Sequence, residues 1–310
     1  MSAKGPVVVL GAAGFVGRAL ITRVAAAGAT VRAVTRVSAA FPPGVSNHVA
    51  GTLGSGTNWA QILDGARTAV HLASRAHAPL GDETWIAEET ETATTLALAA
   101  RKAGLERFVF VSSIKAMGEV TGAVPFRADG VANPAEAYGR AKLAIERALA
   151  EAPNLIVLRP PLIYGPGVKG NFRALLGLVA RGIPLPFASI ANRRSLIFID
   201  NLLDLIEIVL GHVAAPGKIW LMRDGEDIAT PDLIRELARH CGKQARLFPC
   251  PPGLLRQALR LAGRGRDATA LIDSLSVDDG PTRSLLGWRP RTSRDDGLAA
   301  TCRWFEAQRR

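Results

Sequence analysis

Short apolar runs alternate with longer segments of helical periodicity over the first half of the chain. The runs are rich in β-branched and aromatic residues and too short for helices, so they predict strands at residues 6–10, 30–34, 68–72, 107–111 and 154–158. Helical spacing lies between them, at residues 18–27, 88–103 and 135–151. Strands that alternate with helices of this length indicate right-handed βαβ units. We therefore expect an α/β fold built on a doubly wound parallel sheet.

The pattern changes after Pro160, where residues 160–195 become rich in proline and glycine. The later predicted elements are helices at 171–181, 200–210 and 295–308 and a strand at 218–222. Thr230-Pro231 predicts the start of a further helix, with Thr230 as the N-cap and Pro231 in the first helical position. We therefore expect a smaller C-terminal lobe after the parallel sheet, with segments between 166 and 225 shared by both.

Composition disfavours several classes of protein. With 48% hydrophobic residues in a chain of 310, the sequence can bury a large core, which excludes wholesale disorder. The formal charge is +11, but the basic residues are scattered and aromatic residues make up only 5%, which disfavours nucleic-acid binding. Three cysteines and five histidines lack the spacing of a disulfide scaffold or a metal site. No apolar stretch reaches the roughly 18 residues of a membrane span, so we expect a cytoplasmic protein without membrane insertion.

A glycine-rich turn follows the first predicted strand. Gly11, Gly14 and Gly17 are spaced GxxGxxG between the strand VVVL and a helix. Glycine permits a tight turn, close approach of the backbone to a pyrophosphate, and close packing of the helix on the strand. The free N–H groups and the dipole at the helix N-terminus favour the same anion. This context of strand, turn and helix predicts dinucleotide binding rather than a structural turn alone.

Further motifs resemble the extended short-chain dehydrogenase/reductase family, whose best-known members are NAD(P)-dependent nucleotide-sugar epimerases and dehydratases. They follow the glycine-rich turn in the family's order, at Ala69–Ala73, Val111–Gly118, Tyr138–Lys142 (YxxxK), Leu158–Pro161 and Ile163–Gly167. The resemblance implies an NAD(P)-binding Rossmann domain over residues 1–165, with returning segments within about 195–222. It also implies a substrate-binding lobe made of residues 166–194 and 223–310.

The YxxxK pair supplies the predicted catalytic residues. Positions i and i+4 of a helix share one face, so Tyr138 and Lys142 are expected to point into one cleft. A nearby ammonium favours a phenolate, which lets the Tyr138 hydroxyl exchange a proton with a carbinol or carbonyl oxygen. The resemblance implies that Ser113 hydrogen-bonds the same oxygen and that Lys142 also holds the nicotinamide ribose. Ser112 is expected to be a structural or nicotinamide-side hydroxyl.

The resemblance also implies a set of cofactor-binding residues: Gly11, Ala13, Gly14, Phe15, Val16, Gly17, Leu72, Ala73, Ser74, Ser112, Tyr138, Lys142 and Pro161. NAD enzymes commonly carry an acidic residue about 20 positions after the glycines, which binds the ribose 2′-OH. Here the second strand ends in Val34-Thr35-Arg36, and Arg36 can pair with a 2′-phosphate. We therefore expect NADP(H), with NAD(H) and a merely solvated Arg36 as the alternatives.

The segments after Ile163 resemble the nucleoside-diphosphate pocket of sugar-nucleotide enzymes. The resemblance implies that Asn171 faces the diphosphate or sugar, that Leu185 and Phe187 wall the base, and that Arg194 binds a phosphate oxygen. It implies chemistry at C4 of a nucleotide sugar, such as a UDP-linked N-acetyl-hexosamine or 4-keto-6-deoxy derivative, in surface-polysaccharide synthesis. The expected NADP(H) preference favours a 4-ketoreductase over a 4-epimerase with bound NAD.

Two readings from other classes stay open. The fold also hosts NADP-sensing regulators without catalysis, against which the retained Ser113, Tyr138 and Lys142 argue. The second alternative is an oxidoreductase that acts on apolar ketones. The predicted substrate residues Asn171 and Arg194 argue against it. The chain departs from the family at Glu89, where asparagine is usual. A homodimer through helices 88–103 and 135–151 is a further expectation from the resemblance.

Overall fold

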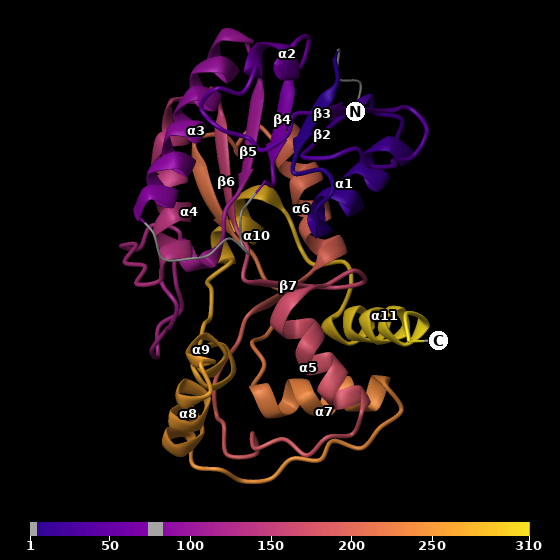
Figure 1. The fold of residues 1–310 in the computed structure, drawn as a ribbon, viewed down its shortest axis with the longest axis vertical. Helices are drawn as coiled ribbons and strands as arrows, with labels where there is room; N and C mark the ends of the chain where they lie inside the picture. The colour runs from indigo at the N-terminus through magenta and orange to yellow at the C-terminus, as the bar shows by residue number, and fades with distance from the viewer. Residues whose placement is uncertain (1–4, 74–82, 310) are drawn as a thin grey trace.

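The computed structural model describes residues 5–73 and 83–309 and contains a seven-stranded sheet flanked by helices (Figure 1). In spatial order the strands are β3 (Val45–Val49), β2 (Val31–Thr35), β1 (Val7–Leu10), β4 (Thr68–His71), β5 (Arg107–Val111), β6 (Leu155–Arg159) and β9 (Lys218–Leu221). All six pairings in this order are parallel. The expected α/β fold with a doubly wound parallel sheet is therefore confirmed.

The strand order reverses at β1. The chain first builds β1, β2 and β3 outward, and then returns to place β4 on the other side of β1. Val9 of β1 consequently pairs with Ala33 of β2 on one side and with Val70 of β4 on the other. In open α/β sheets, ligands bind beyond the carboxyl ends of the strands at such a reversal. The turns that follow β1, β2 and β4 are thus the place to look for a site.

Helices cover both faces of the sheet because successive strand residues point to opposite sides. Val7 and Val9 belong to a core shared with α1 (Phe15–Ala26) and α6 (Ile199–Gly211). Val8 and Leu10 face a second core, shared with α2 (Trp59–Leu63), α3 (Glu83–Lys102) and α4 (Ala137–Ala148). Over the two described stretches of chain, no helix has both the length and the apolar character needed to cross a membrane.

The C-terminal lobe lies below the carboxyl edge of the sheet in the view of Figure 1. A short parallel pair, β7 (Leu162–Tyr164) and β8 (Leu196–Phe198), connects the two parts. The helices of the lobe are α5 (Gly170–Ala180), α7 (Thr230–His240), α8 (Pro252–Leu261), α9 (Gly265–Ile272) and α11 (Arg294–Ala307). A further helix, α10 (Gly280–Leu286), contacts β9 instead.

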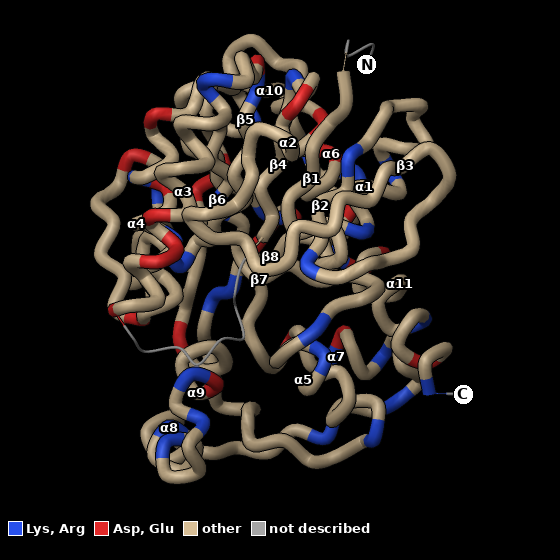
Figure 2. Tube along the Cα trace, turned by 45° about the horizontal axis from the view of Figure 1, so that its top comes forward, with Lys and Arg blue, Asp and Glu red and all other residues tan. Residues whose placement is uncertain are grey.

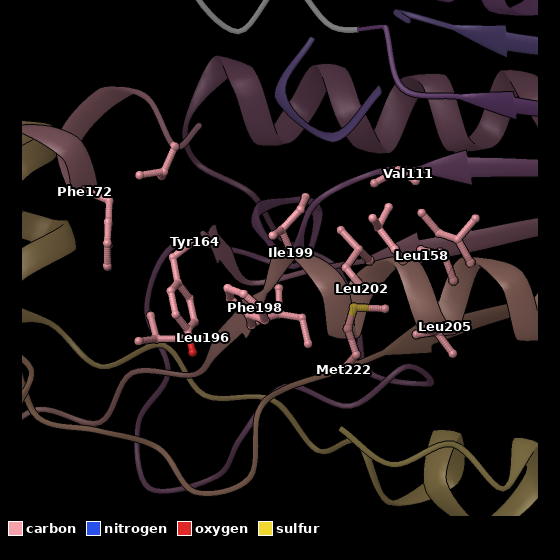
Figure 3. Packing of buried hydrophobic residues seen from close by; sticks show 14 of the residues in the cluster. Val111, Leu158, Tyr164, Phe172, Leu196, Phe198, Ile199, Leu202, Leu205 and Met222 are labelled. Carbon is pink, nitrogen blue, oxygen red and sulfur yellow. The ribbon is translucent and has the colours of Figure 1, made fainter. Parts of the chain in front are cut away.

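One continuous core joins the sheet to the lobe. Figure 3 shows Val111 and Leu158 of the sheet leading through Leu202 to Tyr164 and Phe198. Helix α11 closes on these two rings through Gly297, because a Cβ there would lie 2.8 Å from the Tyr164 hydroxyl and 2.9 Å from the Phe198 ring. Only a residue without a side chain allows this approach.

Two local predictions need correction or completion. Thr230 is not the N-cap of α7: the helix begins at Thr230 itself, Ala229 occupies the N-cap position, and the Thr230 hydroxyl donates to the Leu271 carbonyl at 2.7 Å. Because that hydroxyl is buried against the 271–273 segment, it does not cap the N-terminus of α7. Strand β3 also escaped prediction, because it lies at the edge of the sheet and exposes Ser46 and Asn47.

Candidate active site

The glycine-rich turn packs directly on the end of β4. Gly11 has φ +82°, and a Cβ there would lie 2.6 Å from the Ala73 nitrogen. At Gly17 a Cβ would lie 2.4 Å from the Gly11 carbonyl oxygen. Both contacts are closer than real Cβ atoms tolerate, so these positions need glycine. The result is an exposed helix N-terminus at α1 with its backbone N–H groups free of intrahelical partners, as a phosphate site requires.

A cavity of about 620 Å³ opens beside this turn. Its wall includes residues that sequence reasoning assigned to the cofactor: Gly11, Ala13, Gly14, Arg36, Leu72 and Ala73. Of the other predicted cofactor residues, Phe15, Val16 and Gly17 lie in the first turn of α1, Ser74 lies outside the described residues, and Ser112, Tyr138, Lys142 and Pro161 are not in the cavity wall. The volume is in the range of small-molecule sites. Together with the glycine cradle, it fits a dinucleotide.

His71 at the end of β4 brings a buried polar atom to the cavity wall. The side chain is buried, and its Nδ1 has no hydrogen-bond partner among the described residues. Burial, with a smaller effect from the nearby Lys142 ammonium, lowers the pKa of His71 to about 3. The imidazole therefore stays neutral at physiological pH, and it lines the same cavity. A buried nitrogen without a protein partner is typical of a site that a bound group completes.

The predicted catalytic residues come from two adjoining elements. Ser113 follows β5 and caps the short helix η1 (Ile114–Ala116), where its Oγ accepts a hydrogen bond from the Lys115 N–H at 3.2 Å. Tyr138 and Lys142 lie one turn apart on α4. Helix α4 approaches η1 closely at Gly139, since a Cβ there would lie 2.3 Å from the Lys115 carbonyl oxygen. This contact holds the Tyr138 turn of α4 against the segment that carries Ser113.

Lys142 is enclosed by protein. Its ammonium donates to the Val111 carbonyl at 3.4 Å and lies 4.8 Å from the centre of the Phe110 ring and 6.0 Å from that of Tyr138. Burial lowers the pKa of Lys142 to about 8, while Glu89 and Glu146 favour the charged form. The group is thus poised to change its charge near physiological pH.

A buried network anchors α4 to the sheet. Glu146, one further turn along α4 from Lys142, accepts hydrogen bonds from the Arg159 guanidinium at 2.5 to 3.2 Å. The Ser112 hydroxyl also donates to Glu146. Ser112 is thus committed to this network, and like Ser113, Tyr138 and Lys142 it is not in the cavity wall. Pro161, another predicted cofactor residue, follows β6 and is likewise absent from the cavity wall.

The four predicted substrate residues all lie in the lobe, in two different settings. Asn171 begins α5 and donates to the Asp267 carboxylate at 2.6 Å, and Arg194 donates to the Asp273 carbonyl at 3.1 Å. Both therefore contact α9 or the residue that follows it. Burial lowers the pKa of Arg194 to about 10, so the group stays cationic. Leu185 and Phe187 are buried in the core of the lobe.

Sequence reasoning missed two charged residues of the cavity wall. Glu89 of α3 and Lys169, which precedes α5, both line it. The sequence did mark Glu89 as unusual, because it stands where the family usually has an asparagine. Lys169 lies two positions before the predicted substrate residue Asn171, but only the folded chain brings it next to the glycine-rich turn. Lys169 and Arg36 give the cavity two cationic side chains, which suit a ligand with phosphate groups.

Comparison with known proteins shows the family of this chain. The model of the NAD dependent epimerase/dehydratase family matches residues 7–222. A UDP-glucose 4-epimerase of Vibrio cholerae is 36% identical over 267 residues, covering 82% of this chain and 81% of that protein. A ceramide reductase of Caulobacter vibrioides is 29% identical over 337 positions, covering 98% of this chain and 96% of that protein.

A solved structure shares the whole fold. The UDP-glucuronic acid 4-epimerase of Bacillus cereus, in complex with UDP-glucuronic acid and NAD, superimposes with a TM-score of 0.79 at 19% identity, covering 98% of this chain and 99% of that one. At this identity the likeness concerns the fold alone. The family match, by contrast, spans more than half of the sequence. The chain therefore belongs to the NAD dependent epimerase/dehydratase family and is an enzyme of the extended short-chain dehydrogenase/reductase type.

Proposed function

We propose that this protein is an NAD(P)-dependent oxidoreductase that acts at C4 of a nucleotide sugar. The observation that carries the proposal is the position of Tyr138 and Lys142, one turn apart on α4 and held against the Ser113 segment. Lys142 also interacts with Glu89 in the wall of the dinucleotide cavity, so acid–base groups adjoin the cofactor site. The Vibrio cholerae relative, whose name specifies a UDP-sugar 4-epimerase, supports the substrate class.

Each side chain has a proposed role in this reaction. The glycine-rich turn and Leu72–Ala73 would hold the dinucleotide, whose nicotinamide exchanges a hydride with the sugar when bound. Tyr138 would exchange a proton with the C4 oxygen, and Ser113 would hydrogen-bond that oxygen and fix its position. The Lys142 ammonium would favour the phenolate form of Tyr138 and bind the nicotinamide ribose. Asn171 and Arg194 would meet the diphosphate, with Leu185 and Phe187 behind the base.

Two reactions can use this arrangement. The Vibrio cholerae relative supports a 4-epimerase, which restores its cofactor in every turnover and keeps NAD bound. Arg36 supports the second candidate, a 4-ketoreductase that consumes NADPH, because it lines the cavity at the end of β2 where Val34–Val37 include no carboxylate. The proposed site residues are the same in both.

Cofactor content separates the two reactions. The purified protein is denatured, the released dinucleotide is identified, and the empty protein is titrated with NADPH and NADH. Tightly held NAD, with interconversion of UDP-glucose and UDP-galactose, would establish the epimerase. An empty protein that binds NADPH at least about tenfold more tightly, and loses this preference in Arg36→Ala but not in the exposed control Arg147→Ala, would establish the ketoreductase.

The same protein tests the substrate class. A thermal-shift screen compares UDP and UDP-sugars with apolar ketones, since a ligand that binds only the native state raises the melting temperature. Stabilisation by UDP is expected. Stabilisation by lipid-like ketones alone would contradict the proposal and agree instead with the name of the Caulobacter relative.

Quaternary structure is a further part of the proposal. We expect a homodimer packed through α3 and α4, which lie side by side and leave Leu98 half exposed on the outer face of α3. Sedimentation equilibrium of the wild type and of Leu98→Glu measures it. A monomeric wild type would contradict this expectation without affecting the proposed reaction.

A further inference from the structure

A long segment of the C-terminal lobe carries positive charge only. Between residues 237 and 266 the chain contains no Asp or Glu and seven basic residues, namely Arg239, Lys243, Arg246, Arg256, Arg260, Arg264 and Arg266. The segment runs from the end of α7 through α8 to the start of α9. Figure 2 shows blue positions along α8 and α9 at the far end of the lobe, with red beside the blue at α9, the helix that contains Asp267. This end of the molecule is therefore a basic surface.

Helix α8 presents an apolar stripe on this surface. Of its ten residues only Leu255 is buried, so the helix contributes little to the core. Leu254, Ala258 and Leu261 are all exposed, and their spacing of four and three residues places them on one face. Leu254 is 59% exposed and Leu261 is 83% exposed. Two leucines in water on one helix face favour a partner with an apolar phase.

Unpaired cations surround the more exposed leucine. Arg260 directly precedes Leu261, Arg266 follows it by five positions, and both are exposed. Neither makes an ion pair within the described part of the protein, whereas Arg256 is held by Asp273 at 2.6 Å and Arg264 by Asp267 at 2.6 Å. The tip of the α8–α9 hairpin, residues 260–266, thus combines one free apolar side chain with two free guanidinium groups.

A basic groove begins at the same tip. It has a volume of about 600 Å³ and follows α5 from Gly170 to Arg181, with Arg264 at its wall. Arg173 and Arg309 also line it, each over an aromatic ring, at 5.8 Å from the centre of Trp304 and 5.9 Å from that of Phe305. Arg309 also pairs with Glu306 at 3.3 Å, whereas Arg173 and Arg181 of the groove pair with no carboxylate of the described residues. Guanidinium groups suit phosphate groups.

We propose that the α8–α9 hairpin docks the protein on the surface of a bilayer that contains anionic phospholipid. Leu254 and Leu261 enter the boundary between headgroups and acyl chains, as the apolar face of an interfacial helix does. Arg260, Arg264 and Arg266 lie over the lipid phosphates, and the groove along α5 receives a neighbouring headgroup. No spanning segment is needed. The proposal concerns where the protein works and is independent of the reaction proposed above.

Vesicle co-sedimentation of the full chain tests the docking surface. The vesicles are phosphatidylcholine alone, or phosphatidylcholine with about a third replaced by phosphatidylglycerol. Wild type is expected to bind only the anionic vesicles, and added salt should release it. Arg260→Gln/Leu261→Ser is expected to weaken binding by at least about fivefold, the effect of one charge near such a surface. The matched control Leu285→Ser/Arg289→Gln changes an exposed leucine and arginine at α10 and should bind like wild type.

Each other outcome overturns the proposal. Wild-type binding that is absent, or equal on both vesicles, removes the anionic surface as the partner. An equal loss in the α10 control shows a non-specific effect of charge. Sedimentation velocity without vesicles tests whether a second copy of the chain occupies the surface. That would be so if wild type and the α10 control are dimers and the hairpin variant is a monomer. Anisotropy with duplex DNA would identify nucleic acid if the hairpin variant loses DNA binding and keeps vesicle binding.

Discussion

Lys142 and Tyr138 show what residue spacing can and cannot predict. Their separation of four residues predicts a shared helix face, and the structure places both on α4. The sequence gives no sign that Lys142 is buried or that Glu89 and Glu146 influence its charge. Glu89 is 53 positions away in the chain, and only the packing of α3 against α4 brings the two together. Electrostatics of this kind depends on tertiary contacts that local patterns do not encode.

Tyr138→Phe removes one hydroxyl and tests the proposed acid–base role. The variant should lose about 10²–10⁴-fold in kcat, the usual contribution of a positioned general acid or base. Its dissociation constant for the dinucleotide should stay within about twofold, since the ring remains. The two quantities are measured by steady-state kinetics and by fluorescence titration. Equal activity in the variant would place the proton-transfer group elsewhere.

We expect the charge on Lys142 to determine how kcat falls on the alkaline side, or limb, of its pH profile. The ammonium is the form that assists Tyr138, so kcat should fall as pH rises through about 8, the pKa to which burial lowers this group. Glu89 favours the ammonium. Glu89→Gln should therefore lower the pKa of Lys142 further and move the limb to lower pH.

The control for this shift is Glu91→Gln, which neutralises an exposed carboxylate on the same helix. It should leave the pH profile unchanged. A limb that stays in place in Glu89→Gln would mean that Lys142 does not control it.

At the scale of elements, the site depends on how closely α4 meets η1. Gly139→Ala would place a methyl group 2.3 Å from the Lys115 carbonyl oxygen, so α4 must move. We expect a loss of about 1–3 kcal/mol in the free energy of unfolding, as for other overpacked positions, and a fall in kcat because Tyr138 moves with the helix. Urea unfolding and kinetics measure both.

Gly211→Ala is the matched control for that substitution. Gly211 is also helical, at the end of α6, and nothing lies within 4 Å of a Cβ built there. Its stability should change by no more than about 0.5–1 kcal/mol, in the stabilising direction. Equal effects of the two substitutions would show that helix propensity, not the α4–η1 contact, governs Gly139.

The elements themselves were predictable to different degrees. Strand β5 has the predicted bounds because Phe108–Val111 are apolar and buried on both faces of the sheet, after Arg107 at its start. Strand β3 was not predicted, since an edge strand with exposed polar residues lacks that pattern. The Glu146–Arg159–Ser112 network was also missed. Its members belong to three elements, and hydrogen bonds between distant elements leave no periodic signal in the sequence.

Across the whole molecule, the core passes without interruption from the sheet to the lobe. One hydrophobic cluster contains Val9 of β1, Phe198 of β8 and Phe305 of α11. The sequence indicated two parts but not this continuity, because the contact between Tyr164 and Gly297 joins residues 133 positions apart (297 − 164). The contact of Asn171 with Asp267 joins residues 96 positions apart.

A shared core predicts that sheet and lobe unfold together. Near the denaturation midpoint, amides of β1 and of α11 should exchange with the same free energy of opening, because neither part keeps a closed core alone. Hydrogen exchange with mass spectrometry resolves the two peptides. A lower opening free energy for α11 would show instead that the lobe is an independently folding unit.

The close contact of Gly297 with Tyr164 and Phe198 also matters during synthesis of the protein on the ribosome. Ribosomes add about 5–20 residues per second, so Val9 emerges roughly 15 to 60 seconds before Phe305 can complete the same cluster. During that interval the apolar surface that α11 covers is open to the solvent. The nascent protein therefore exposes a defined apolar surface, which is buried when α11 docks.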